Sequence, residues 1–171
     1  MKPNKHLKEL DGLRTRLYDS ELKRREEENR SYMMHLENRF LLLNFNLEAG
    51  RDTSDNVIEG MHGGWEFPTC QLRGHFLGHW LSATAMRYHA VGDKEIKAKA
   101  DAIVDELAEC QKANGGQWAG PIPEKYLYRI AQGKQVWAPH YTIHKVFMGL
   151  LDMYEYAGNE TALEIAENFA D

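Results

Sequence analysis

The sequence predicts an all-α fold, a partial (α/α)6 toroid built from hairpins of one inner and one outer helix. Two segments are apolar on nearly every side, and each is followed by a tight turn and a charged amphipathic segment. This unit occurs twice, at an interval of about 66 residues. Repeated hairpins also suit an open α-solenoid, but inner helices covered on all sides favour the toroid. Six hairpins need about twelve helices and this chain supplies five or six, so we expect about half a barrel.

The first predicted helix covers Ser20–Leu47. Its early part, residues 23–30, is almost entirely charged and is expected to face solvent. Its apolar residues recur at spacings of three and four, which places them on one helix face. These residues are Met33, Leu36, Phe40, Leu43 and Leu47.

The first repeat begins with a helix predicted over Leu72–Ala90, whose apolar surface indicates an inner position. Gly92 then supplies a helix stop, and Asp93 is a suitable N-cap for the next helix. That helix, predicted over Asp93–Lys112, is charged except for one apolar stripe and is therefore expected on the outside. The stripe consists of Ile96, Ala100, Ile103, Leu107 and Cys110.

The second repeat follows the same plan. An apolar helix is predicted over Tyr141–Ala157, Gly158 stops it, and Asn159 can cap a charged amphipathic helix over Glu160–Asp171. Each inner helix also begins with two histidines four residues apart. These pairs are His75 with His79 and His140 with His144.

Composition excludes several classes of function. The net charge is −5 and no basic tract is present, which argues against a nucleic-acid partner. No stretch approaches 18 apolar residues, so no membrane span is expected. The charged N-terminus is followed by no apolar run, which argues against a signal peptide and predicts a cytoplasmic location. Cys70 and Cys110 have no metal-type spacing; reduced thiols are favoured over one disulfide.

Function is expected in the two long loops that lead into the inner helices, Gly50–Gln71 and Ala113–Pro139. The second loop has room for a short helix near 124–132. In a toroid both loops lie at one rim, above the starts of the inner helices. They hold three of the four tryptophans, Trp65, Trp118 and Trp137, whose flat rings can cover the apolar face of a sugar. The alternative is that these tryptophans only anchor the loops.

The histidine pairs allow three interpretations. Spacing of i, i+4 places both rings of a pair on one helix face, which suits a metal site. No glutamate follows the first histidine of either pair, so the His-Glu-x-x-His pattern is absent. Hydrogen bonding to a substrate at the cavity mouth is favoured, and a structural role for the rings stays open.

A pair of carboxylates is the usual machinery for glycoside hydrolysis. Glu59, Glu66 and Glu124 are candidates near the predicted rim, and Glu66 stands out because it follows Gly-Gly-Trp. The sequence places no second carboxylate against it. The chain contains no nucleophile elbow, P-loop or dinucleotide fingerprint.

Several of these motifs, in this order, resemble glycoside hydrolase family 127, the β-L-arabinofuranosidase family. The resemblance rests on Gly63-Gly64-Trp65-Glu66, residues 72–83 (LRGHFLGHWLSA), residues 106–111 (ELAECQ), residues 136–145 (VWAPHYTIHK) and residues 149–152 (GLLD). It implies that residues 1–16 are an N-terminal extension. It implies also that residues 17–171 are the incomplete N-terminal part of an (α/α)6-barrel catalytic domain.

The resemblance further implies exo-acting hydrolysis of β-L-arabinofuranosides or related plant-type sugars. In this family a cysteine acts as the nucleophile on a zinc ion held by further cysteines and a glutamate, and another glutamate is the acid/base. Those motifs have no counterpart here, so no catalytic residue, no metal ligand and no cofactor is assigned to this segment, and zinc is expected in the complete enzyme. What transfers is a carbohydrate-binding rim. Its predicted residues are Trp65, Glu66, His75, His79, Trp137, His140 and His144.

Two other functions fit the same pattern. Another α/α-toroid enzyme, such as a sugar epimerase or an unsaturated-uronide hydrolase, needs histidines or carboxylates at this rim and no zinc. A non-catalytic carbohydrate-binding or scaffold module needs no reactive groups at all. The sequence makes no prediction about the oligomeric state.

Overall fold

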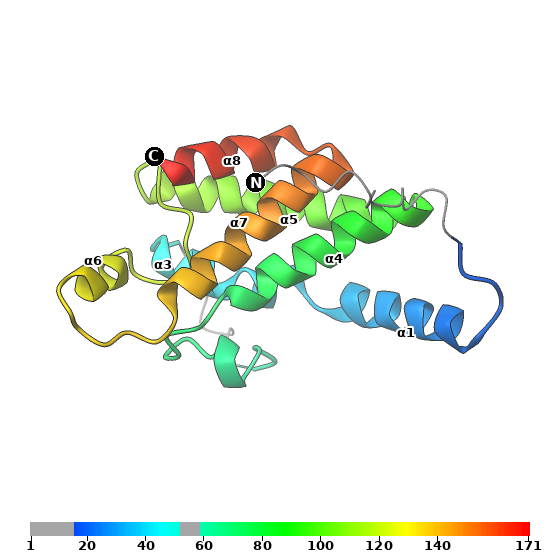
Figure 1. Ribbon diagram of the computed structural model, residues 1–171, viewed down its shortest axis with the longest axis horizontal. Helices are drawn as coiled ribbons and strands as arrows, with labels where there is room; N and C mark the ends of the chain where they lie inside the picture. The colour runs from blue at the N-terminus through cyan, green and yellow to red at the C-terminus, as the bar shows by residue number, and fades with distance from the viewer. Residues whose placement is uncertain (1–15, 52–58) are drawn as a thin grey trace, which may run out of the picture.

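The computed structural model of the chain describes residues 16–51 and 59–171, and the regular structure of these residues is helical. Two helical hairpins lie side by side and form most of the fold (Figure 1). Their helices are α4 (His75–Val91) with α5 (Lys94–Ala113), and α7 (Pro139–Ala157) with α8 (Glu160–Ala170). The inner helices α4 and α7 run in the same direction and the outer helices return beside them (Figure 1). The predicted all-α class and its inner and outer helices are confirmed.

The two hairpin turns are built alike. Gly92 and Gly158 end the inner helices with φ of 71° and 65°, a left-handed conformation that costs glycine little because it has no Cβ. Asp93 and Asn159 then cap the outer helices. The Asp93 carboxylate accepts from the Ile96 N–H at 3.3 Å, and the Asn159 side-chain oxygen accepts from the Ala162 N–H at 2.9 Å. The internal repeat is therefore a repeat of turn chemistry as well as of apolar pattern.

The core lies between the inner and outer helices. The predicted stripe of α5 is buried there along its length, with Ile96 and Ile103 fully enclosed. The inner helices make the most extensive helix contact, and they meet at glycines. A Cβ on Gly78 would lie 1.9 Å from the Lys145 carbonyl oxygen, and one on Gly149 would lie 2.7 Å from the Gly78 carbonyl oxygen. The α4 and α7 backbones are thus in direct contact.

The prediction of one continuous helix over Ser20–Leu47 is wrong. The chain forms α1 (Glu21–His35), α2 (Asn38–Leu41) and α3 (Leu43–Glu48), separated by an extended residue at Leu36 (ψ 121°) and a bend near Leu42. Residues 40–45 are all buried. A straight helix would point part of this run away from the core, so burial of every member requires the breaks.

Part of each inner helix faces solvent, in contrast to the expectation that these helices are covered on all sides. Large apolar side chains stay exposed on α4 and α7: Met86, Val91, Leu151 and Tyr154. Such exposure is what half of a barrel predicts.

Among the helices that the structure describes, none is long and apolar enough to span a membrane. Of the predicted extension over residues 1–16, only Arg16 is among the described residues. Residues 52–58 of the predicted loop Gly50–Gln71 also lie outside them.

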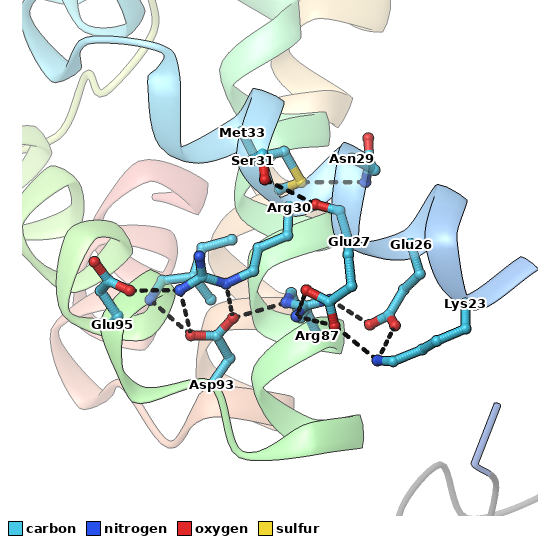
Figure 2. Close-up of polar contacts among 11 residues, drawn as sticks. Lys23, Glu26, Glu27, Asn29, Arg30, Ser31, Met33, Arg87, Asp93 and Glu95 are labelled. Atoms are coloured by element: carbon cyan, nitrogen blue, oxygen red, sulfur yellow. Dashed lines mark hydrogen bonds and ion pairs between the residues drawn. The ribbon is translucent and has the colours of Figure 1, made fainter. Parts of the chain in front are cut away.

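A network of charges fastens α1 to the first hairpin turn (Figure 2). One oxygen of Asp93 accepts from Arg30 Nε at 2.6 Å and from Arg87 Nε at 2.7 Å, and Arg87 also pairs with Glu26 and Glu27 on α1. Only 9% of the Asp93 side chain is exposed. The hydrogen bond from Arg30, together with those from Arg87 and the Ile96 N–H, holds the pKa of Asp93 well below its usual range although burial opposes this shift.

Replacing Gly78 with alanine is expected to destabilise the chain by about 1–3 kcal/mol, because the added methyl group meets the α7 backbone. The loss should appear even though alanine has the higher helix propensity, by about 1 kcal/mol. Urea unfolding followed by circular dichroism measures it. Gly63→Ala is the matched control, since a Cβ there meets nothing within 4 Å. Equal stability of the two variants would contradict the backbone contact.

Asp93→Asn is expected to lower the free energy of unfolding by about 2–3 kcal/mol at neutral pH, because asparagine keeps the cap but leaves Arg30 and Arg87 without their shared anion. Since the pKa of Asp93 is lowered on folding, its stabilisation is present above the ordinary aspartate pKa and is lost as pH falls below about 4. The difference between variant and parent should therefore shrink between about pH 5 and pH 2. The exposed pairs of Glu21 make Glu21→Gln a control that should cost less than about 0.5 kcal/mol.

Candidate functional site

The two long loops lie together at the starts of the two inner helices, where the sequence predicts the rim. The 3₁₀ helix η2 (Gly64–Glu66) precedes α4, and α6 (Lys125–Ala131), the short helix expected near 124–132, precedes α7. Because α4 and α7 are parallel, both preceding loops lie at the same end of the hairpins (Figure 1).

Five rings from the two loops and the two inner helices form one cluster at this end, which we call the rim cluster: Trp65, His75, His79, Trp137 and Tyr141. The two indoles meet edge to face, with centroids 6.2 Å apart and an interplanar angle of 82°. The His75 ring lies 6.0 Å from Trp65, 6.1 Å from His79 and 5.9 Å from Tyr141. Trp65 and Trp137 remain 61% and 50% exposed. The rim cluster thus brings together four of the predicted rim residues and leaves both indoles half exposed or more.

Backbone and side-chain bonds tie the second loop to the first. The Trp137 N–H donates to the side-chain oxygen of Gln71 at 2.6 Å, and Thr142 on α7 donates to the Leu72 carbonyl at 3.5 Å. Ala138, which lies between Trp137 and Thr142 in the sequence, has a φ of 49°. This left-handed conformation is disfavoured for alanine, and more so before a proline. These cross-loop bonds hold Trp137 where its ring meets Trp65.

Glu66 has its carboxylate directed at α4. One oxygen accepts from the Gly74 N–H at 2.7 Å, and the other accepts from the Phe76 N–H at 3.0 Å and lies 2.6 Å from His75 Nδ1. The side chain therefore caps α4 from eight residues away, a position that favours a negative charge. Of the other candidate carboxylates, Glu59 is exposed, and Glu124 is exposed and accepts from the Tyr128 hydroxyl at 2.9 Å. Sugar contact by Glu66 stays a prediction.

His79 is the more open of the two α4 histidines. Its Nε2 lies 3.2 Å from the Tyr141 hydroxyl. Burial lowers the pKa of His79, and the nearby positive charge of Lys145 lowers it further. Both effects favour the neutral ring, which can donate a hydrogen bond to a hydroxyl group through one nitrogen and accept one through the other.

The second histidine pair is placed differently from the first. His140 and His144 are both exposed on the first turns of α7, and His144 is close enough for its charge to act on His79. The α7 residue whose ring meets the α4 histidines is Tyr141. His140, the residue before it, is rotated from Tyr141 by about 100° around the helix axis. Lys145, one turn after Tyr141, has its Nζ 5.1 Å from the Tyr141 ring centroid.

Sequence reasoning missed Tyr141 and Lys145 as site residues. The i, i+4 spacing that singled out the histidines also links these two residues on the neighbouring face of α7. This spacing shows that Tyr141 and Lys145 share one face of α7, but it does not show that this face meets α4.

Trp118 is a loop anchor, the alternative role that the sequence left open for the loop tryptophans. Its Nε1 donates to the Ile122 carbonyl at 3.0 Å, and its ring packs edge to face on Phe169 of α8 at 5.2 Å. It fastens the loop to the outer helices, away from the rim cluster.

A cavity of about 260 Å³ lies next to Glu66. It is lined by Tyr32, His62, Gly63, Glu66 and Phe76. The cavity presents the His62 imidazole and two aromatic rings. Burial lowers the pKa of His62 although the nearby charge of Glu66 opposes this shift. A second cavity, of about 300 Å³, lies between the outer helices α5 and α8 and is remote from the rim cluster.

The described residues do not fit a zinc–thiolate centre. Across 16–51 and 59–171, no three histidine, cysteine, aspartate or glutamate side chains are grouped to hold a metal ion. Both cysteines are free thiols. Burial raises the pKa of Cys110 to about 11, and its Sγ donates to the Asn46 side chain at 3.3 Å, whereas zinc binding and nucleophilic attack require a thiolate.

Comparison with known proteins identifies the family of the chain. No curated protein matches the chain. The family model described as "Beta-L-arabinofuranosidase, GH127 catalytic domain" matches residues 14–171, which include both hairpins, both loops and the whole rim cluster. The chain therefore belongs to the β-L-arabinofuranosidase catalytic-domain family, glycoside hydrolase family 127.

Proposed function

We propose that the rim cluster is the sugar-binding part of a β-L-arabinofuranosidase that acts on plant-type L-arabinofuranosides, and that the cysteine–zinc centre is supplied from outside this sequence. The observation that carries the first part is the meeting of Trp65 and Trp137, from loops about 70 residues apart, with Trp65 also in contact with His75 of α4. Family membership supports a carbohydrate substrate.

The chemistry of the rim cluster suits a furanose ring. A sugar has apolar C–H faces and hydroxyl edges, so it binds where flat aromatic surface meets a few fixed polar groups. The two indoles, set at 82°, offer two such surfaces. The imidazoles of His75 and His79 and the hydroxyl of Tyr141 lie beside them and can bond to sugar hydroxyls.

The proposal that the nucleophile and zinc lie elsewhere rests on the cysteines. The sequence has two, and they are free thiols, one of them buried with a raised pKa. The residues of the rim cluster then bind and orient the sugar and exclude water from one of its faces. When bound, the zinc–cysteine group would supply the nucleophile of the reaction.

Lys145 favours a second candidate function, the binding of an acidic sugar by a related toroid enzyme. Its ammonium group lies beside Tyr141, and its charge reaches His79. A uronate carboxylate placed at this rim would meet that charge. Tighter binding of a uronide than of an arabinofuranoside would select this function over the leading one.

Trp65→Ala and Trp137→Ala are each expected to weaken binding of an aryl β-L-arabinofuranoside by roughly tenfold, because each removes one stacking surface worth about 1–1.5 kcal/mol. Isothermal titration calorimetry on the purified chain measures the dissociation constants. Trp118→Phe is the matched control and should leave affinity unchanged, since Trp118 packs on Phe169. If all three variants bind like the parent, the rim cluster is not the sugar site.

No hydrolysis of an aryl β-L-arabinofuranoside is expected from the folded 171-residue chain. A longer chain carrying the family's cysteine motifs after Asp171 should hydrolyse it. Release of the aryl group, followed by absorbance, is the measurement, with circular dichroism as the check on folding. Turnover by the 171-residue chain would contradict the location proposed for the reactive centre.

A further inference from the structure

One carboxylate oxygen of Glu66 serves the backbone and a rim residue at the same time. It accepts from the Phe76 N–H at 3.0 Å and lies 2.6 Å from His75 Nδ1, while the other oxygen accepts from the Gly74 N–H at 2.7 Å. The side chains of Glu66 and His75 are only 14% and 11% exposed. Because two N–H groups at the start of α4 hold the carboxylate, its position relative to the imidazole is fixed.

A second acceptor lies beside the same nitrogen. The Leu72 carbonyl oxygen is 3.1 Å from His75 Nδ1. Neither a carboxylate nor a carbonyl oxygen can donate a hydrogen bond, so Nδ1 must carry the proton. In a neutral ring protonated at Nδ1, Nε2 has the free lone pair and accepts.

We propose that Glu66 is a positioning residue: it fixes the ring of His75 in the Nδ1–H tautomer, so that Nε2 is presented as a hydrogen-bond acceptor for a sugar hydroxyl. This inference rests on the proposed sugar-binding function of the rim cluster. It gives Glu66 a role through His75 that differs from direct contact with sugar. The aromatic neighbours of His75, Trp65 and Tyr141, hold the plane of the ring at 6.0 and 5.9 Å between centroids.

The choice of acceptor matters because the two acceptors differ in strength. A hydrogen bond to a charged group is worth roughly twice one to a neutral carbonyl. The Glu66 carboxylate therefore contributes most of the preference for the Nδ1–H form, and the Leu72 carbonyl adds to it. Loss of the carboxylate should leave a mixture of tautomers in place of one.

The direct test is the tautomer of His75 in the sugar-free chain, read from imidazole ¹⁵N chemical shifts at about pH 8, above the ordinary histidine pKa. The parent should show the Nδ1–H form. Glu66→Ala should reduce the ratio of Nδ1–H to Nε2–H by on the order of tenfold, and Glu66→Gln, which keeps an oxygen but no charge, by several-fold. Glu124→Gln, a carboxylate of the other loop, is the matched control and should change nothing.

Several outcomes would overturn the proposal. A doubly protonated or Nε2–H ring in the parent would do so, as would an unchanged ratio in both Glu66 variants, which would reduce Glu66 to a helix cap. Thermal unfolding separates the two roles, since a cap alone lowers stability without changing the tautomer. If Glu66→Ala does not fold, the ratio in Glu66→Gln decides.

Sugar binding is then measured on the same variants. Glu66→Ala should weaken binding of the aryl arabinofuranoside by on the order of tenfold, and Glu66→Gln by less. If the tautomer changes as expected but the parent binds no arabinofuranoside, the proposed function fails while control of His75 by Glu66 stands. If the parent binds the arabinofuranoside and the Glu66 variants bind it equally well although their tautomer ratio has changed, the positioning role in binding fails and the proposed function stands.

Discussion

The contact between the backbones of α4 and α7 is the constraint on which the rest of the structure depends. At Gly78 and Gly149 no side chain separates the two helices. This close approach fixes how far one helix can slide along the other, because any shift would bring a side chain against backbone. His75 and His79 flank Gly78, and Tyr141 lies two turns before Gly149, so the same contact sets the distances within the rim cluster.

Glu66 links the fold to the site in a second way. Its carboxylate supplies the cap that the N-terminus of α4 lacks, since Gly74 has no side chain to do so. Because the Glu66 side chain is bonded to the start of α4, the residue before it, Trp65, lies next to the His75 ring. One residue therefore begins the helix, orients an imidazole and positions an indole.

The parts of the fold that follow from local chemistry were predictable from the sequence. The Gly-Asp and Gly-Asn turns and the apolar periodicity placed the ends of four helices within a few residues, and the repeat predicted that both long loops reach one rim. The breaks between α1, α2 and α3 were not predictable, because they arise when a run of adjacent residues, 40–45, is buried against the hairpins. In the site, histidine spacing predicted His75 and His79, whereas the place of Tyr141 depends on the rotation of α7 against α4, which packing sets.

The attachment of α1 has a different physical character from that of the other long helices. Met33 is its one buried residue, and most of its other links to the first hairpin are ion pairs from Glu26, Glu27 and Arg30, which are partly open to solvent. Apolar packing is little affected by ionic strength, whereas exposed charge pairs are screened over about 8–10 Å at physiological salt. Salt therefore screens the pair of Glu27, whose side chain is 49% exposed, before the pairs of Asp93, whose side chain is only 9% exposed. Rising ionic strength weakens the outer part of this attachment first, while Asp93 keeps α1 on the first hairpin turn.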